Sequence, residues 1–106
     1  MQIDPSTFSR ADGYYFMISA IVPRPIAFVS TADARGHANA APFSYFTGVS
    51  SSPPSLLICS GRRRDGDGMK DTQRNIAATR EFVVNVVVEE MMDAVAIAGV
   101  DHPPGV

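Results

Sequence analysis

The chain has 106 residues, of which 45% are hydrophobic and 19% are charged, so it has the composition of one globular domain and not of a disordered segment. The formal net charge of −2 argues against nucleic acid as the main partner, because binding to phosphates needs a basic face. The single cysteine excludes an internal disulfide framework and a cysteine-based zinc site. We expect this residue, Cys59, to be a small buried hydrophobic residue in mid-strand.

The two ends of the chain and its first apolar segment bear on where the protein works. The start has no basic region ahead of an apolar run, so no secretory signal is predicted. The apolar segment at residues 14–29 is interrupted by Pro23 and Pro25, which argues against a membrane span. We therefore expect a cytoplasmic protein. The turn-like residues 102–106, with no closing element after them, suggest that the domain is incomplete at this end.

The first third of the chain predicts a helix followed by a β-hairpin. Residues 4–6 can start a helical turn, and residues 11–22 favour a short helix that the prolines at 23 and 25 must end. Residues 26–31 are rich in β-branched and aromatic side chains and predict a strand. Residues 33–37 have the length of a hairpin loop, with Gly36 where a positive φ is needed. The next strand should therefore pair antiparallel with the first.

The segment at residues 39–61, NAAPFSYFTGVSSSPPSLLICSG, predicts two further strands. Residues 39–47 alternate small or polar residues with aromatic ones, residues 50–54 break that pattern, and residues 55–59 form a short buried strand. Hydroxyl groups crowd one end of this pair. On composition alone they favour ordinary turn chemistry, and the alternative is a wall of donors and acceptors for a planar polar ligand. The hydroxyl residues are Ser44, Thr47, Ser50, Ser51 and Ser52.

The last third predicts a loop, a helix, a strand and a second helix. Residues 61–69 are glycine-rich and charged, and they lack the later ligands of a calcium loop, so we reject calcium. A helix is expected from Asp71 or Thr72, either of which could cap it, to Thr79. Residues 81–88 are the clearest strand, and residues 89–99 form a helix that Gly99 ends. The order of elements predicts a mainly β domain, an antiparallel barrel or sheet with helical additions.

The loop at residues 61–72 is the best chemical candidate. It places three arginines and Lys70 directly before a helix start, where free N–H groups and the helix dipole favour an anion. A phosphate site is one interpretation, and a solvated charged loop is the other. Asp71 argues against an anion unless its side chain caps the helix or pairs with an arginine.

No acid–base machinery is evident in the sequence. His37 falls in the hairpin loop and His102 in the tail, so both are expected at the surface. Glu89 and Glu90 fit the first turn of a helix, where negative charge is favoured. Zinc-protease, P-loop and dinucleotide-binding glycine patterns are missing. If the protein is an enzyme, a cofactor should supply the chemistry.

Five blocks of the chain, in this order, resemble the flavin reductase-like, FMN-binding split-barrel family. They are PRPIAFVST at residues 23–31, NAAPFSYF at 39–46, SPP at 52–54, KDT with NI at 70–76, and EFVVN at 81–85. The resemblance implies a six-stranded antiparallel split β-barrel of Greek-key type, with FMN bound near a homodimer interface. It covers about residues 22–88, and family members continue well past residue 106.

The resemblance also implies roles for individual residues. The isoalloxazine ring would be lined by backbone and hydroxyl groups of Phe43, Ser44, Tyr45, Phe46, Thr47, Ser50 and Ser51. The ribityl phosphate would be held by Ser60, Gly61, Arg62, Lys70, Asp71 and Thr72. Arg24 is a further candidate for the phosphate or the ring edge. No side chain is expected to be catalytic.

The function implied by the resemblance is transfer of electrons from NAD(P)H through FMN to free flavin, oxygen or another acceptor. Two alternatives remain open. One is a truncated, non-catalytic split-barrel module that dimerises but holds flavin weakly or not at all. The other is an oxidase of the pyridoxamine-phosphate oxidase type, which shares the barrel. The proline–arginine–proline and KDT blocks favour the flavin reductase type over that oxidase.

Overall fold

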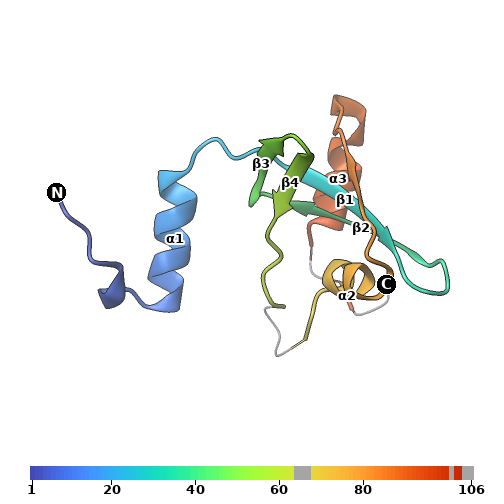
Figure 1. The fold of residues 1–106 in the computed structure, drawn as a ribbon. Coiled ribbons are helices and arrows are strands. Elements are labelled where there is room, and N and C mark those ends of the chain that lie inside the picture. The colour runs from blue at the N-terminus through green and yellow to red at the C-terminus, as the bar shows by residue number, and fades with distance from the viewer. Residues whose placement is uncertain (64–67, 101, 104–106) are drawn as a thin grey trace.

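The computed structural model describes residues 1–63, 68–100, 102 and 103. Five strands form two antiparallel sheets, one in the order β2-β1-β5 and the other a β3-β4 hairpin (Figure 1). The predicted mainly β class with helical additions and antiparallel pairing is confirmed. The strands are β1 (Ala27–Ala32), β2 (Ala38–Phe43), β3 (Phe46–Ser51), β4 (Pro54–Ile58) and β5 (Val83–Asn85). The helices are η1 (Pro5–Thr7), α1 (Arg10–Ala20), α2 (Asp71–Thr79), η2 (Glu89–Met91) and α3 (Met92–Ala98).

The core of the molecule lies on β1, the central strand of the larger sheet. Ala27 and Val29 are fully buried and pack with Phe43 from the end of β2. β1 pairs with all of β2, from Ala27 opposite Phe43 to Ala32 opposite Ala38. Partly buried apolar side chains complete this cluster, and two of them come from the β3-β4 hairpin: Ala41, Phe46, Ile58 and Val84. The hairpin is therefore attached to the larger sheet through one of its faces.

Helix α2 is fixed to the sheet by buried polar side chains. Asn75 is 6% exposed, and its Nδ2 donates to Thr31 Oγ1 of β1 at 3.1 Å. Buried amide and hydroxyl groups are costly unless they are hydrogen-bonded, so this bond requires α2 to keep one position on β1. The start of α2 is held beside β2 in the same way, because the buried Thr72 accepts a hydrogen bond from Asn39.

The loop between β1 and β2 is organised by Asp33. Its Oδ1 accepts from the backbone N–H groups of Arg35 and His37 at 2.8 and 2.9 Å, and its Oδ2 lies 2.9 Å from His37 Nδ1. Gly36 has a φ of 86°, as the hairpin required. These hydrogen bonds favour the carboxylate, and the bonds from the backbone and side chain of His37 lower the pKa of Asp33 from 3.8 to about 2.

We expect this loop to lose its order in acid only when Asp33 is protonated. Because the pKa is lowered by folding, the stabilisation is complete above about pH 4 and is lost as the pH falls towards 2. An NMR titration of the Asp33 carboxyl carbon should give a midpoint near 2. A midpoint near 3.8 would mean that the hydrogen bonds of the loop do not persist in solution. Asp33→Asn, which keeps the Oδ1 acceptor, should preserve the loop better than Asp33→Ala.

Two strand predictions were wrong in their extent. Residues 39–47 form parts of two strands, because β1 offers no partner beyond Ala27 and Phe46 instead pairs with Ile58 in the other sheet. Ser50 and Ser51, expected to break the pattern, lie inside β3. The predicted strand at residues 81–88 is reduced to β5, because only its residues 83–85 pair with β1. Asn85 extends this pairing through its side chain, which donates to Phe28 O and Ser30 Oγ, both at 3.0 Å.

The prediction for Cys59 was also wrong, whereas the helix predictions were confirmed. Cys59 follows the last residue of β4 and is exposed, because the two-stranded sheet is covered on one face only. Helix α1 lies within the predicted residues 11–22, apart from its first residue, and the segment from η2 to α3 matches the predicted residues 89–99. Glu89 and Glu90 occupy the first turn of η2, as expected. Within the described part of the chain, no helix is both long and apolar enough to cross a membrane.

Candidate functional site

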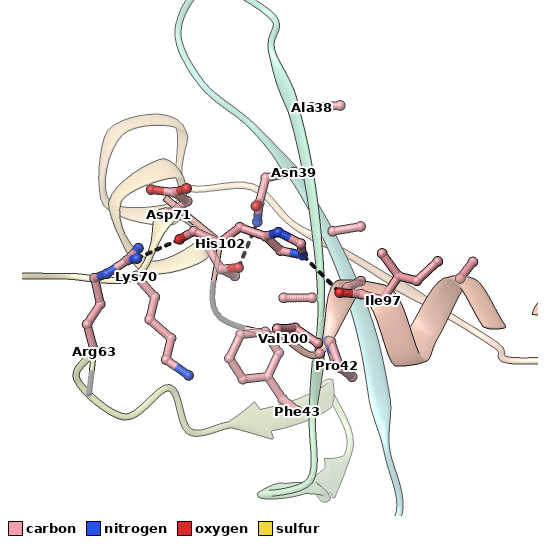
Figure 2. Close-up of a pocket in the computed structure, with 16 residues that line it drawn as sticks. Ala38, Asn39, Pro42, Phe43, Arg63, Lys70, Asp71, Ile97, Val100 and His102 are labelled. Atoms are coloured by element: carbon pink, nitrogen blue, oxygen red, sulfur yellow. Dashed lines mark hydrogen bonds between the residues drawn. The ribbon is translucent and has the colours of Figure 1, made fainter. Parts of the chain in front are cut away.

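A groove of about 460 Å³ lies between β2, the start of α2 and the end of α3 (Figure 2). β2 is an edge strand of its sheet, and all six of its residues line this groove. The volume is within the range of about 300–1,000 Å³ that is usual for small-molecule sites. The polar side chains that line it are those of Asn39, Arg63, Lys70, Asp71, Thr72 and His102. Of the predicted site residues, Phe43, Lys70, Asp71 and Thr72 are therefore brought together here.

The start of α2 has the properties of an anion site. Its N-cap residue is Lys70, and no side chain caps the first turn. The prediction that Asp71 or Thr72 caps the helix was wrong, because Lys70 holds the N-cap position and both residues lie inside the first turn, where Asp71 pairs with Arg74 and Thr72 bonds to β2. Within the described residues, the Lys70 ammonium forms no ion pair. Unused N–H groups and an adjacent cation favour a negatively charged ligand at this point.

The negative charge of Asp71 does not oppose that conclusion. Its carboxylate forms an ion pair with Arg74, three residues further along α2. The sequence allowed a phosphate here if Asp71 paired with an arginine. A paired carboxylate repels an anion less than a free one does. The pair also joins two residues of the same helix surface, where neighbours three apart can interact.

Thr72 and Asn39 connect the α2 start to β2. Thr72 is 2% exposed, and Asn39 Nδ2 donates to its Oγ1 at 2.9 Å. The Thr72 hydroxyl therefore accepts from Asn39 and keeps its own hydrogen for a further acceptor. Asn39 begins one of the five sequence blocks but was not predicted as a site residue. The signal that could have found it is its place as the one strongly polar side chain in β2.

Replacing Thr72 with valine should lower the free energy of unfolding by about 1–3 kcal/mol. Valine has nearly the shape of threonine, but it leaves the Asn39 amide without its acceptor in a partly buried position. Thr72→Ser keeps the hydroxyl and should lose less stability. Urea denaturation of both variants measures the difference. Equal losses for valine and serine would show that the methyl group of Thr72, and not its hydroxyl, stabilises the fold.

The groove is also lined by His102, which the sequence analysis assigned to the surface, and by Arg63, one of the three arginines of the loop at residues 61–72. Arg63 Nη2 donates to His102 O at 2.6 Å, and His102 Nε2 donates to Ile97 O at 2.9 Å near the end of α3 (Figure 2). Arg63 lines the groove, whereas the predicted Arg62 is exposed and does not. Arg63 and His102 are 39 positions apart, so no local pattern could have predicted their contact.

Tyr45 contacts one predicted site residue, Arg24, and the chain neighbour of another, Ser60. The Arg24 guanidinium lies over the Tyr45 ring, 5.4 Å from its centroid, and the Cys59 N–H donates to Tyr45 O at 2.9 Å. Arg24 Nη1 and Ser60 Oγ are buried and have no hydrogen-bond partner in the described part of the chain. Buried polar atoms are seldom left unpaired, and both atoms can donate to an anionic or carbonyl oxygen. Their chemistry therefore fits a polar cofactor.

The remaining predicted residues lie apart from the groove. Thr47, Ser50 and Ser51 are exposed on β3, where Thr47 Oγ1 donates to Gly48 O at 3.2 Å and Ser50 Oγ accepts from Ser52 N at 3.2 Å. Two of these hydroxyls thus serve the hairpin backbone, as turn chemistry would require. The others are Ser44 and Tyr45 at the bend between β2 and β3, Phe46 beside the core, and Gly61 and Arg62 in the exposed loop.

A family model described as the flavin reductase like domain matches residues 18–106. The chain belongs to this flavin reductase-like family. Membership accounts for the order of the sequence blocks around Pro23, Asn39 and Lys70.

The flavin reductase-like chain has relatives in several bacteria. It is 43% identical over 104 residues to an uncharacterised protein of Halalkalibacterium halodurans, with 98% of this chain and 49% of the relative covered. It is 45% identical over 93 residues to an uncharacterised protein of Aquifex aeolicus, with 88% and 47% covered. The chain thus spans about half the length of these relatives.

Two solved structures have the same fold. Nitrilotriacetate monooxygenase component B from Bacillus cereus superposes with a TM-score of 0.84 and 34% identity, covering 98% of this chain and 50% of the other. The 2-nitrobenzoate 2-nitroreductase of Pseudomonas fluorescens gives a TM-score of 0.81 and 31% identity, covering 96% and 48%. The similarity supports the predicted split-barrel fold class, of which the described residues form two antiparallel sheets.

Proposed function

We propose that this chain binds FMN without a covalent bond and belongs to an NAD(P)H-dependent flavin reductase. The observation that carries the proposal is the uncapped start of α2 beside Lys70, in a groove of a flavin reductase-like fold. A phosphate is the part of FMN that such a helix start recognises best. Both solved structures of similar fold are named for components that act in reduction or oxygenation, which supports a redox function for the whole protein.

The residues of the groove would hold the phosphate end of FMN. Lys70 would supply a positive charge, the first N–H groups of α2 would supply directed donors, and Thr72 would donate its hydroxyl hydrogen. Asn39 orients that hydroxyl by donating to its oxygen. The negative charge of Asp71 at the helix start is balanced by its ion pair with Arg74.

The residues around Tyr45 would hold the ring end of the cofactor. Arg24 Nη1 and Ser60 Oγ are buried donors without a partner among the described residues, which supports a contact with a polar edge. Ser44, at the bend between β2 and β3, adds a hydroxyl close in sequence to Tyr45. The backbone of Phe43 and Phe46 would form one side of this ring site, because their side chains are held in place by packing in the core.

Bound FMN would accept a hydride from NAD(P)H and pass electrons to free flavin, oxygen or another acceptor. The side chains of this part of the protein would bind and orient the cofactor and limit its contact with water. No proton transfer by a side chain is part of the proposal. We further propose that the protein acts in the cytoplasm as a homodimer.

A non-catalytic dimerisation module is the second candidate function. It is favoured by the exposure of Thr47, Ser50 and Ser51, which the resemblance assigned to the flavin ring. A chain of this kind would dimerise and retain little or no flavin. FMN retention therefore separates the two candidates.

Comparing FMN with riboflavin tests the proposed function, because the two ligands differ in the phosphate alone. Titration calorimetry should give a dissociation constant for FMN about ten- to hundredfold lower, since hydrogen bonds to a charged group contribute about 1.5–3 kcal/mol. Oxidation of NADH and NADPH in the presence of FMN then measures the choice of donor. Equal affinities for FMN and riboflavin would contradict a phosphate site at α2.

A further inference from the structure

Arg24 carries a positive charge that no carboxylate balances within the described part of the chain. Its guanidinium lies over the Tyr45 ring, 5.4 Å from the centroid, and forms no ion pair among the described residues. Its Nη1 atom is buried and has no hydrogen-bond partner there. A guanidinium is always charged, so burying one of its donors without an acceptor is costly. The face of an aromatic ring attracts a cation but does not cancel its charge. Arg24 therefore favours a negatively charged ligand group beside it.

Three segments of the chain come together around this cation. The start of β1 pairs with the end of β2, and Arg24 shortly precedes the start of β1. Tyr45 lies in the bend that follows β2, and its carbonyl accepts from the N–H of Cys59 after the end of β4. The next residue, Ser60, has a buried Oγ that also lacks a partner in this part of the chain. Two unsatisfied donors therefore come from segments that both contact Tyr45.

The phosphate of FMN is not the group that fits Arg24. In the proposed function the phosphate lies at the start of α2, which is joined to the beginning of β2 by the hydrogen bond between Asn39 and Thr72. Arg24 approaches the other end of β2. Along an extended strand, Asn39 and Phe43 are about 13 Å apart, so one phosphate does not contact both ends. The flavin ring is the part of the cofactor left to face Arg24.

The proposed reaction changes the charge of that ring. The oxidised ring is neutral, and a hydride consists of one proton and two electrons. Its transfer from NAD(P)H leaves oxidised nicotinamide behind and brings one negative charge to the ring. A positive group that is already in place stabilises this charge without rearrangement, and it does so more strongly where water is partly excluded.

We propose that Arg24 balances the negative charge that hydride transfer brings to the flavin ring, so that the site binds reduced FMN more tightly than oxidised FMN. This role rests on the proposed function and adds to it a reason for the charge of one side chain. Tyr45 acts as a positioning residue, because its ring holds the guanidinium. A tenfold preference for the reduced form raises the two-electron midpoint potential of the bound cofactor by about 30 mV.

Arg24→Gln tests the role of the charge, because glutamine keeps a side-chain N–H donor and removes the cation. Anaerobic titration calorimetry, in mildly alkaline buffer that keeps the reduced ring anionic, gives the dissociation constants of oxidised FMN and of FMN reduced with dithionite. Wild type should bind the reduced form at least about tenfold more tightly, and Arg24→Gln should lose about tenfold of this preference. Spectroelectrochemistry should then show a midpoint potential about 30 mV lower in the variant.

Two variants and a second ligand serve as controls. Arg24→Lys keeps the charge and should retain most of the preference for reduced FMN. Arg35→Gln removes an exposed cation from the β1-β2 loop, at the opposite end of the sheet, and should change the preference less than about twofold. Riboflavin lacks the phosphate and should show the same loss of preference in Arg24→Gln as FMN does.

Equal binding of oxidised and reduced FMN by wild type overturns the proposal, and this result needs no variant to fold. A preference that Arg24→Gln retains also overturns it, provided that circular dichroism shows a folded variant. If Arg24→Gln weakens both forms of FMN alike and leaves riboflavin unchanged, Arg24 binds the phosphate and not the ring. Wild type that binds FMN in neither form contradicts the proposed function itself, whereas bound FMN with an unchanged preference contradicts only the role of Arg24.

Discussion

Lys70→Ala should raise the dissociation constant for FMN about ten- to hundredfold and leave the affinity for riboflavin nearly unchanged. Lys70 is the N-cap residue of α2, lines the groove and forms no ion pair within the described residues. A charge-assisted hydrogen bond contributes about 1.5–3 kcal/mol, and each 1.4 kcal/mol or so is a factor of about ten in affinity. Fluorescence quenching of the flavin measures both constants.

Two controls separate the position of the charge from its presence. Lys70→Arg keeps a cation at the helix start and should retain most of the affinity for FMN. Arg10→Ala removes one positive charge from α1, away from the groove, and should change the affinity less than about twofold. If Lys70→Ala binds FMN as tightly as wild type, the α2 start is not the phosphate site, and the proposal loses its main support.

Phe43→Ala should lower the free energy of unfolding by about 3–5 kcal/mol, the cost usual for deleting a buried aromatic side chain. Phe43 is 6% exposed and packs with Ala27 and Val29 at the centre of the core. Since small domains are stable by only about 5–15 kcal/mol, this variant should lose a large part of its stability. Urea denaturation gives the value directly.

Phe43→Leu distinguishes a core role from a contact of the ring with the cofactor. Leucine keeps most of the buried apolar surface and should cost about 1–2 kcal/mol. If the flavin meets the backbone of Phe43, as the resemblance implied, the FMN affinity of this variant should stay within about threefold of wild type. A loss of less than about 1 kcal/mol in Phe43→Ala would contradict its place in the core.

Local features of the sequence were enough to predict the elements that depend on local chemistry. The prolines at 23 and 25 ended the first helix, Gly36 marked the hairpin loop, and β-branched residues marked β1. The same residues also carried the family resemblance, which the family model then confirmed over residues 18–106. Propensity and turn chemistry act over a few residues, so a single sequence contains them.

Features that depend on a distant partner could not be predicted in the same way. The strand predicted at residues 39–47 divides near Ser44 because β1 ends there as a partner. The Thr72 hydroxyl accepts a hydrogen bond from Asn39, 33 residues earlier. Arg63 and His102 meet across 39 residues. Each outcome depends on which segments pack together, and a strand or cap propensity does not specify that.

The visible absorption spectrum of the purified protein, before and after addition of FMN and passage through a desalting column, tests the central claim most directly. We predict that the protein retains a flavin spectrum at close to one FMN per chain, and that Lys70→Ala retains clearly less. A protein that folds, as judged by circular dichroism, and emerges from the column without flavin would contradict FMN binding by this chain and favour the non-catalytic module.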